Sequence, residues 1–116
     1  MAYIGTTQTP FKKLYITGNY KNFNEFYDLN KNLIYSNIIE VLKGFTTSKK
    51  RKLTLYIQAI ILGIEWDHEF LFEPQGGYKL LNDTILPYFE QIENYEKCNE
   101  ILSILDLLNK KNNCTI

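Results

Sequence analysis

The sequence predicts an α+β fold, in which a three-stranded antiparallel sheet packs against a long helix and a C-terminal helical hairpin. Three patterns support this prediction. Residues 53–73 alternate apolar and polar side chains on both sides of a glycine, as a β-hairpin does. Residues 23–43 instead place apolar side chains every three or four positions, the spacing of one helical face. The last third of the chain repeats that helical spacing in two segments joined by a short link, which is typical of an αα-hairpin.

The first predicted element is a short strand over residues 12–17. Leu14 and Ile16 alternate there with more polar neighbours, and the glycine and asparagine that follow have turn chemistry. Residues 1–10 are mostly polar and include Gly5 and Pro10. We therefore expect a flexible arm that leads into an edge of the sheet.

A long helix is predicted over residues 23–43. Asn22 can act as its N-cap, and Glu25 follows three residues later, as in a capping box. Gly44 and the apolar residue after it are typical of a helix that stops at a C′ glycine. A polar and basic segment, residues 46–52, then connects this helix to the hairpin.

The predicted hairpin consists of strands over residues 53–62 and 65–73. Gly63 and Ile64 lie between them and match a two-residue type II′ turn, in which glycine comes first. Pairing outward from this turn sets Leu62 against the first residue of the return strand. The turn chemistry therefore fixes a definite register between the two strands.

This register sorts the side chains of the hairpin by face. One face carries Leu55, Ile57, Ala59, Ile61, Trp66, His68, Phe70 and Phe72. The acidic side chains fall on the other face. A slip by one residue would move every side chain to the opposite face, so the agreement favours the hairpin. A helical pattern also fits residues 53–64, and an all-α domain is therefore the alternative fold.

The remaining residues predict the helical hairpin. Residues 74–77 are expected to form a loop, because they combine proline and two glycines. The next helix can be capped by Asp83 or Thr84, and Asn94 interrupts its pattern and can cap the last helix. Residues 110–116 are polar and are expected to form a flexible tail.

Length and composition indicate a single small globular domain over residues 1–116. The chain is 45% hydrophobic and 22% charged, which is ordinary for a folded domain. Its longest apolar run covers residues 59–62, far short of the roughly 20 residues of a membrane span. The N-terminus lacks the pattern of a secretory signal, so we expect a cytoplasmic protein. The 13 basic and 13 acidic residues balance, which argues against a general nucleic-acid binder.

Two charged clusters are candidate binding sites. The densest positive patch consists of Lys49, Lys50, Arg51 and Lys52. Such a patch can engage a phosphate backbone while exposed tyrosines stack on bases, or it can be a solvated loop. Glu65, Asp67 and Glu69 form an acidic row on one face of the return strand. That row can bind a basic surface, discourage pairing between strand edges, or simply be solvated.

The only histidine, His68, lies between Asp67 and Glu69 in the sequence. In a strand these two carboxylates point to the opposite face, so they cannot share a proton or a metal ion with it. We expect a half-buried structural side chain packed beside Trp66 and Phe70. The chain also lacks a phosphate-binding loop, and its two cysteines are too far apart for a zinc or redox motif. The sequence therefore predicts no catalytic residue, no metal site and no cofactor.

Three functions are compatible with these observations. The first is a non-catalytic protein-binding module, because the chain is small and its 15% aromatic content suits interfaces. Its residue bias resembles that of an AT-rich coding sequence, so the module could be a phage- or mobile-element-encoded modulator or inhibitor of a host defence nuclease complex. The second is an RNA- or DNA-binding accessory protein that uses Lys49–Lys52. The third is a small hydrolase or metal enzyme around His68. The oligomeric state is left open.

Overall fold

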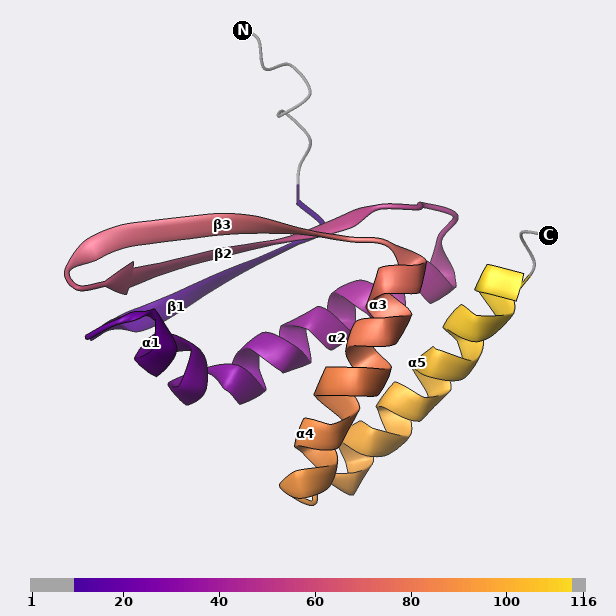
Figure 1. Ribbon diagram of the computed structural model, residues 1–116. Helices are drawn as coiled ribbons and strands as arrows, with labels where there is room; N and C mark the ends of the chain where they lie inside the picture. Colours follow the sequence, from indigo (N-terminus) through magenta and orange to yellow (C-terminus); the bar gives the residue numbers. More distant parts are fainter. Residues whose placement is uncertain (1–9, 114–116) are drawn as a thin grey trace, which may run out of the picture.

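The computed structural model describes residues 10–113 and contains a three-stranded sheet with helices on one side (Figure 1). The elements in chain order are β1 (Lys12–Tyr20), α1 (Phe23–Leu29), α2 (Lys31–Thr47), β2 (Leu53–Ile61), β3 (Ile64–Phe72), α3 (Pro74–Leu80), the π-helical turn η2 (Leu81–Ile85), α4 (Leu86–Gln91) and α5 (Tyr95–Asn113). The predicted α+β class, long helix and C-terminal helical hairpin are confirmed, and the all-α alternative is wrong.

The sheet is mixed rather than wholly antiparallel. Its strand order is β1-β2-β3, with β2 antiparallel to β3 but parallel to β1. The antiparallel prediction is therefore wrong for β1. The reason lies in the connection: α2 runs back along the sheet and returns the chain to the end at which β1 begins. The next strand must then run in the same direction as β1.

The hairpin faces are as predicted, but the turn is displaced by one residue. Leu62 and Gly63 form the turn with φ angles of 57° and 72°, and Ile61 pairs with Ile64. Two positive φ angles define a type I′ rather than a type II′ turn. The register shifts by two residues relative to the prediction, and an even shift leaves every side chain on its predicted face. The Leu62 amide donates to the Tyr20 carbonyl at 2.7 Å, which helps to hold this backbone.

The helix predicted over 23–43 is two helices that meet at Asn30. The Asn22 cap is confirmed, since the Glu25 amide donates to Asn22 Oδ1 at 2.8 Å. The Asn30 side chain donates to the Phe26 carbonyl at 2.8 Å and so competes for a carbonyl at the end of α1. The break changes the direction of the chain and lets α1 lie under the hairpin end of the sheet (Figure 1).

Gly44 does not end the helix, which continues to Thr47. A Cβ atom at Gly44 would lie 2.8 Å from Phe11 Cζ and 3.0 Å from the Leu53 side chain. The glycine is thus required by the close approach of Phe11, just before β1, and of β2 to α2, and not by a change of backbone direction.

The predicted loop over 74–77 is wrong, because these residues form the first turn of α3. Pro74 stands at the start of the helix, where its missing amide hydrogen costs nothing. Gly77 lets the helix approach α2, since a Cβ atom there would lie 2.5 Å from the Leu42 side chain. Asp83 and Thr84 do not cap a helix but lie in η2, through which α3 continues into α4.

The last helix begins as predicted and extends further than predicted. Asn94 Oδ1 accepts a hydrogen bond from the Lys97 amide at 3.1 Å, which is a side-chain N-cap. Residues 110–113 continue α5, so the tail predicted to be flexible from residue 110 is helical there. The rest of that tail and residues 1–9 lie outside the described residues.

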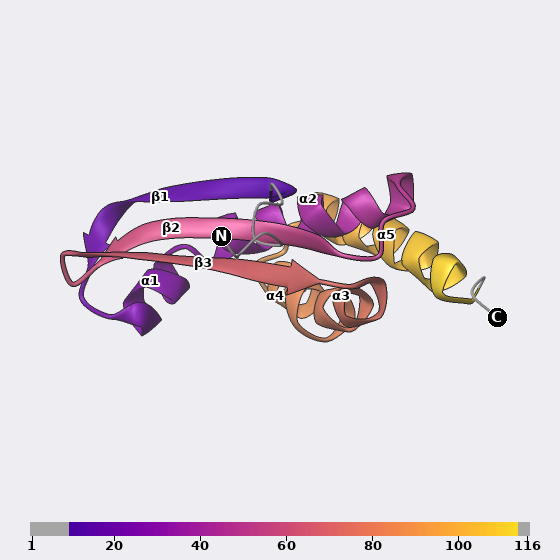
Figure 2. The same cartoon turned by 90° about the horizontal axis from the view of Figure 1, so that it is seen from above.

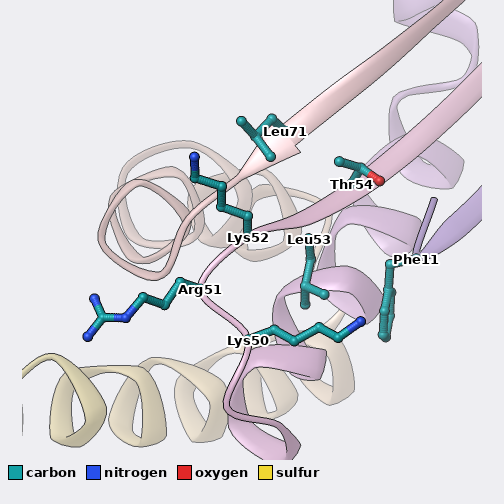
Figure 3. A pocket seen from close by; sticks show the side chains of 7 residues that line it. All are labelled: Phe11, Lys50, Arg51, Lys52, Leu53, Thr54 and Leu71. Atoms are coloured by element: carbon teal, nitrogen blue, oxygen red, sulfur yellow. The ribbon is translucent and has the colours of Figure 1, made fainter. Parts of the chain in front are cut away.

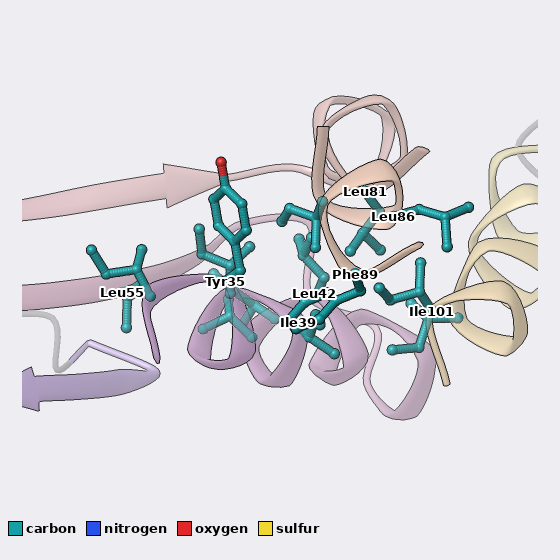
Figure 4. Packing of buried hydrophobic residues seen from close by; sticks show 14 of the residues in the cluster. Tyr35, Ile39, Leu42, Leu55, Leu81, Leu86, Phe89 and Ile101 are labelled. Atoms are coloured by element: carbon teal, nitrogen blue, oxygen red, sulfur yellow. The ribbon is translucent and has the colours of Figure 1, made fainter. Parts of the chain in front are cut away.

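The core lies between the sheet and α2 and continues between α2 and the helical hairpin. Figure 4 shows Tyr35, Ile39 and Leu42 of α2 between β2 and the C-terminal helices. We expected the helical hairpin to cover the sheet beside the long helix. Instead α5 packs against α2, α3 and α4, which gives a flat molecule of 47 × 45 × 17 Å. Within residues 10–113, no helix is both long and apolar enough to cross a membrane.

Candidate functional site

An open groove lies under β3. The inward residues of β2, such as Leu55 and Ile57, are buried. Their pairing partners on β3 are not: Phe70 is half-buried and His68 is exposed. The cause is that β3 is an edge strand. Figures 1 and 2 show α1 near one end of β3 and α3 near the other, and α2 follows β1 and β2. The inward face of β3 is thus left uncovered along its middle.

We call this space the aromatic groove. It has a volume of about 230 Å³ and is lined by Phe23, Phe26, Tyr27, Ile34, Tyr35, Ile38, Leu55, Ile57, Trp66, Phe70, Leu80 and Thr84. Trp66 packs edge-on against Phe23 and Phe26, with ring centroids 5.5 and 5.6 Å apart. The lining of the aromatic groove is almost wholly apolar, so the groove suits an apolar side chain or molecule.

The polar end of the aromatic groove is a pair of tyrosines. The hydroxyls of Tyr27 and Tyr35 share a hydrogen bond. Burial, followed by this hydrogen bond, raises the pKa of Tyr35 above its ordinary value. Tyr35 therefore stays protonated throughout the physiological range and offers a neutral hydroxyl rather than a charge.

His68 lies beside the groove. Its ring stacks on Trp66 at 6.4 Å and meets Phe70 edge-on at 4.5 Å. The neighbouring carboxylates point to the other face, as predicted, but the imidazole is exposed rather than half-buried. Across residues 10–113, no group of three or more histidine, cysteine or acidic side chains could hold a metal ion.

The acidic row lies on the outward face of the sheet, which carries no helix. Glu65, Asp67 and Glu69 pair there with the outward residues of β2. The Tyr56 hydroxyl donates to Asp67 Oδ2 at 2.8 Å, and this hydrogen bond is the main cause that raises the pKa of Tyr56 to about 12. One acid of the row is thus held by a tyrosine, and the other two project from the edge strand.

The positive patch connects α2 to β2. Lys50, Arg51 and Lys52 line a hollow of about 640 Å³ together with Phe11, Leu53, Thr54 and Leu71, which we call the basic hollow (Figure 3). The parallel pairing of β1 places Lys12 opposite Leu55, so the start of β1 lies at the same end of the sheet. The sequence predicts that Lys12 and Lys13 lie near the patch if the first strand pairs with the hairpin, and β1 does pair with β2.

Comparison with known proteins gives no further guide to this site: no family model matches the chain, and no curated protein or solved structure matches it. The site must therefore be interpreted from its own chemistry. The alternation of Trp66, His68 and Phe70 did signal an inward apolar face. It did not signal that this face remains open, since that depends on which strand lies at the edge.

Proposed function

We propose that this protein is a non-catalytic protein-binding module that holds an apolar side chain of its partner in the aromatic groove. The observation that supports the proposal is the uncovered inward face of β3. Trp66 and Phe70 are only half-buried there, although the matching residues of β2 are completely buried. A partner that covers this face would complete the core.

The size and chemistry of the aromatic groove suit an anchor residue. A cavity of about 150 Å³ with aliphatic and aromatic walls can hold a benzene ring. The groove offers about 230 Å³, which is room for an aromatic or branched aliphatic side chain. Aromatic residues in desolvated pockets supply most of the binding energy of protein interfaces. The tyrosine pair at its polar end can orient an anchor that carries one polar atom.

A narrower form of the proposal concerns the biological setting. Such a module would act in the cytoplasm as a phage- or mobile-element-encoded modulator, for instance an inhibitor of a host defence nuclease complex. This narrower form rests on the small size and the residue bias of the chain. A modulator of this kind would occupy a surface of a larger machine, which requires a groove or face and no chemistry of its own.

A capture experiment with matched variants tests the proposal. Phe23 is 47% exposed and Tyr95 is 63% exposed, so replacing either ring by alanine leaves the core intact. Immobilised wild-type protein and Tyr95→Ala should retain one stoichiometric protein from the native host. Phe23→Ala should retain at least roughly tenfold less, because a central aromatic contact is worth about 2 kcal/mol or more. Equal retention by all three would contradict the proposal.

A further inference from the structure

The positive charges of the basic hollow have no counterions in the part of the chain that the structure describes. The four ion pairs within residues 10–113 involve Lys31, Lys43, Lys97 and Lys110. None of them involves Lys13 or Lys50–Lys52. In Figure 3, Lys50 extends toward Phe11 and Lys52 lies beside Leu71, so two ammonium groups flank the hollow. These cations are free to meet an external anion.

Exposed aromatic rings lie next to these cations. Phe11 is 50% exposed and borders the basic hollow, while Tyr15 is 59% exposed and borders a second hollow. The second hollow has about 590 Å³ and is lined by Pro10, Lys13, Tyr15, Tyr56, Asp67, His68 and Glu69. Both hollows therefore combine an exposed ring with a lysine, and both include residues at or just before the start of β1.

The two rings lie on different sides of the sheet. Lys13 and Tyr15 share the outward face of β1, since side chains two apart share a face. Phe11 precedes β1, and its ring borders the basic hollow from the side of α2, next to Gly44. A cation and an exposed ring thus lie next to each other on the outward face of β1. Single-stranded nucleic acids are bound by this combination, in which lysines meet phosphates and rings stack on unpaired bases.

We propose that the β1 side of the outward sheet face binds single-stranded nucleic acid. Lys13, Lys50 and Lys52 contact phosphates, and Tyr15 stacks on a base. Asp67 and Glu69 on β3 form a negative border to this track. A duplex, whose second phosphate backbone would reach that border, is disfavoured. The track lies on the opposite face of the sheet from the aromatic groove, so this inference goes beyond the proposed function.

The expected salt dependence of binding follows from the number of lysines that contact phosphates. The protein as a whole is neutral, so no long-range attraction adds to the local contacts. Binding to three phosphates of a single strand should give a slope of log K against log salt of roughly −2, because each contact contributes about −0.7. RNA and DNA share the phosphates and bases that are contacted here. An oligouridylate and an oligothymidylate therefore separate a preference for one sugar from binding to both.

The test is fluorescence anisotropy of short labelled oligouridylate and oligothymidylate with the full chain. The expected result is binding with the slope given above, weakened roughly tenfold or more in the triple variant Lys50→Glu, Arg51→Glu and Lys52→Glu. Tyr15→Ala should weaken it roughly fivefold or more, since a stacked base is lost. Glu69→Gln should strengthen binding, because it removes a negative charge from the border.

Control variants at other lysines and at another exposed tyrosine test whether the effects are specific to this surface. The triple variant Lys21→Glu, Lys31→Glu and Lys97→Glu changes the net charge by the same amount at other sites, and it should bind like the wild type. Tyr95→Ala removes an exposed ring elsewhere and should also leave binding unchanged. Equal binding by both triple variants would overturn the inference. So would equal affinity for inorganic polyphosphate with no loss in Tyr15→Ala, because base stacking would then play no part.

Discussion

At the scale of single residues, two adjacent glycines have opposite roles. Gly76 and Gly77 both lie in the first turns of α3. A Cβ atom at Gly76 would meet no atom within 4 Å, whereas one at Gly77 would lie 2.5 Å from a side chain of Leu42, which is completely buried. Only the second glycine is therefore required by packing, and the first is replaceable.

We predict opposite effects of alanine at these two positions. Gly76→Ala should raise the free energy of unfolding by about 0.5–1 kcal/mol, because alanine is the better helix former. Gly77→Ala should lower it by about 1–3 kcal/mol, since the core around Leu42 must be displaced. Chemical denaturation of the two variants measures both values. Equal effects of the same sign would contradict the close approach of α3 to α2.

A second prediction at this scale concerns Tyr56. Its hydroxyl is held by Asp67, and its pKa is raised from 10.0 to about 12. The neutral hydroxyl is therefore favoured in the folded state. This contribution to stability is complete below pH 10 and is lost as the pH rises through about 12. NMR titration of the Tyr56 ring should show that Asp67→Asn moves the pKa back toward 10. An unchanged pKa would show that the hydrogen bond does not hold the hydroxyl.

At the scale of the elements, the turn of the hairpin decides the register. Leu62 adopts a positive φ, which leucine tolerates poorly and asparagine tolerates well. Leu62→Asn should therefore raise the free energy of unfolding by about 1 kcal/mol. Ile64 is exposed to the same extent, 68%, but has an extended backbone, so Ile64→Asn should be neutral or slightly destabilising. A turn centred on Gly63 and Ile64 would give no gain for Leu62→Asn.

The elements also show what the sequence could and could not determine. Period-two alternation in 53–73 predicted which side chains share a face, and an error of two residues in the register left those faces unchanged. Local sequence patterns wrongly predicted a helix end at Gly44 and a loop at Gly77. Both glycines lie within helices and are required by close contacts with distant residues, not by their own backbone conformation. The direction of β1 likewise depends on how α2 packs. The open groove follows from that packing, so no local pattern could reveal it.

At the scale of the whole molecule, the sheet separates two candidate surfaces. The aromatic groove lies on its inward side, the hollow beside Tyr15 lies on its outward side, and the basic hollow lies at the end of the sheet where β2 begins. Because no residue lines both the groove and either hollow, the two activities should be independent. We predict that Phe23→Ala leaves oligonucleotide affinity unchanged and that the triple variant of Lys50, Arg51 and Lys52 leaves protein capture unchanged. Anisotropy and capture on the same preparations test this, and losses in both assays would show that one surface serves both.

The most direct test of the central claim, that the groove under β3 is a binding site, uses Trp66. It is the only tryptophan of the chain, and it lines the groove. Its fluorescence in the free protein should be quenched by acrylamide, since the indole is only half-buried. With saturating amounts of the captured partner, we expect marked protection from quenching and a shift of the emission to shorter wavelength. Quenching that is unchanged when the partner is bound would show that the partner docks outside the aromatic groove.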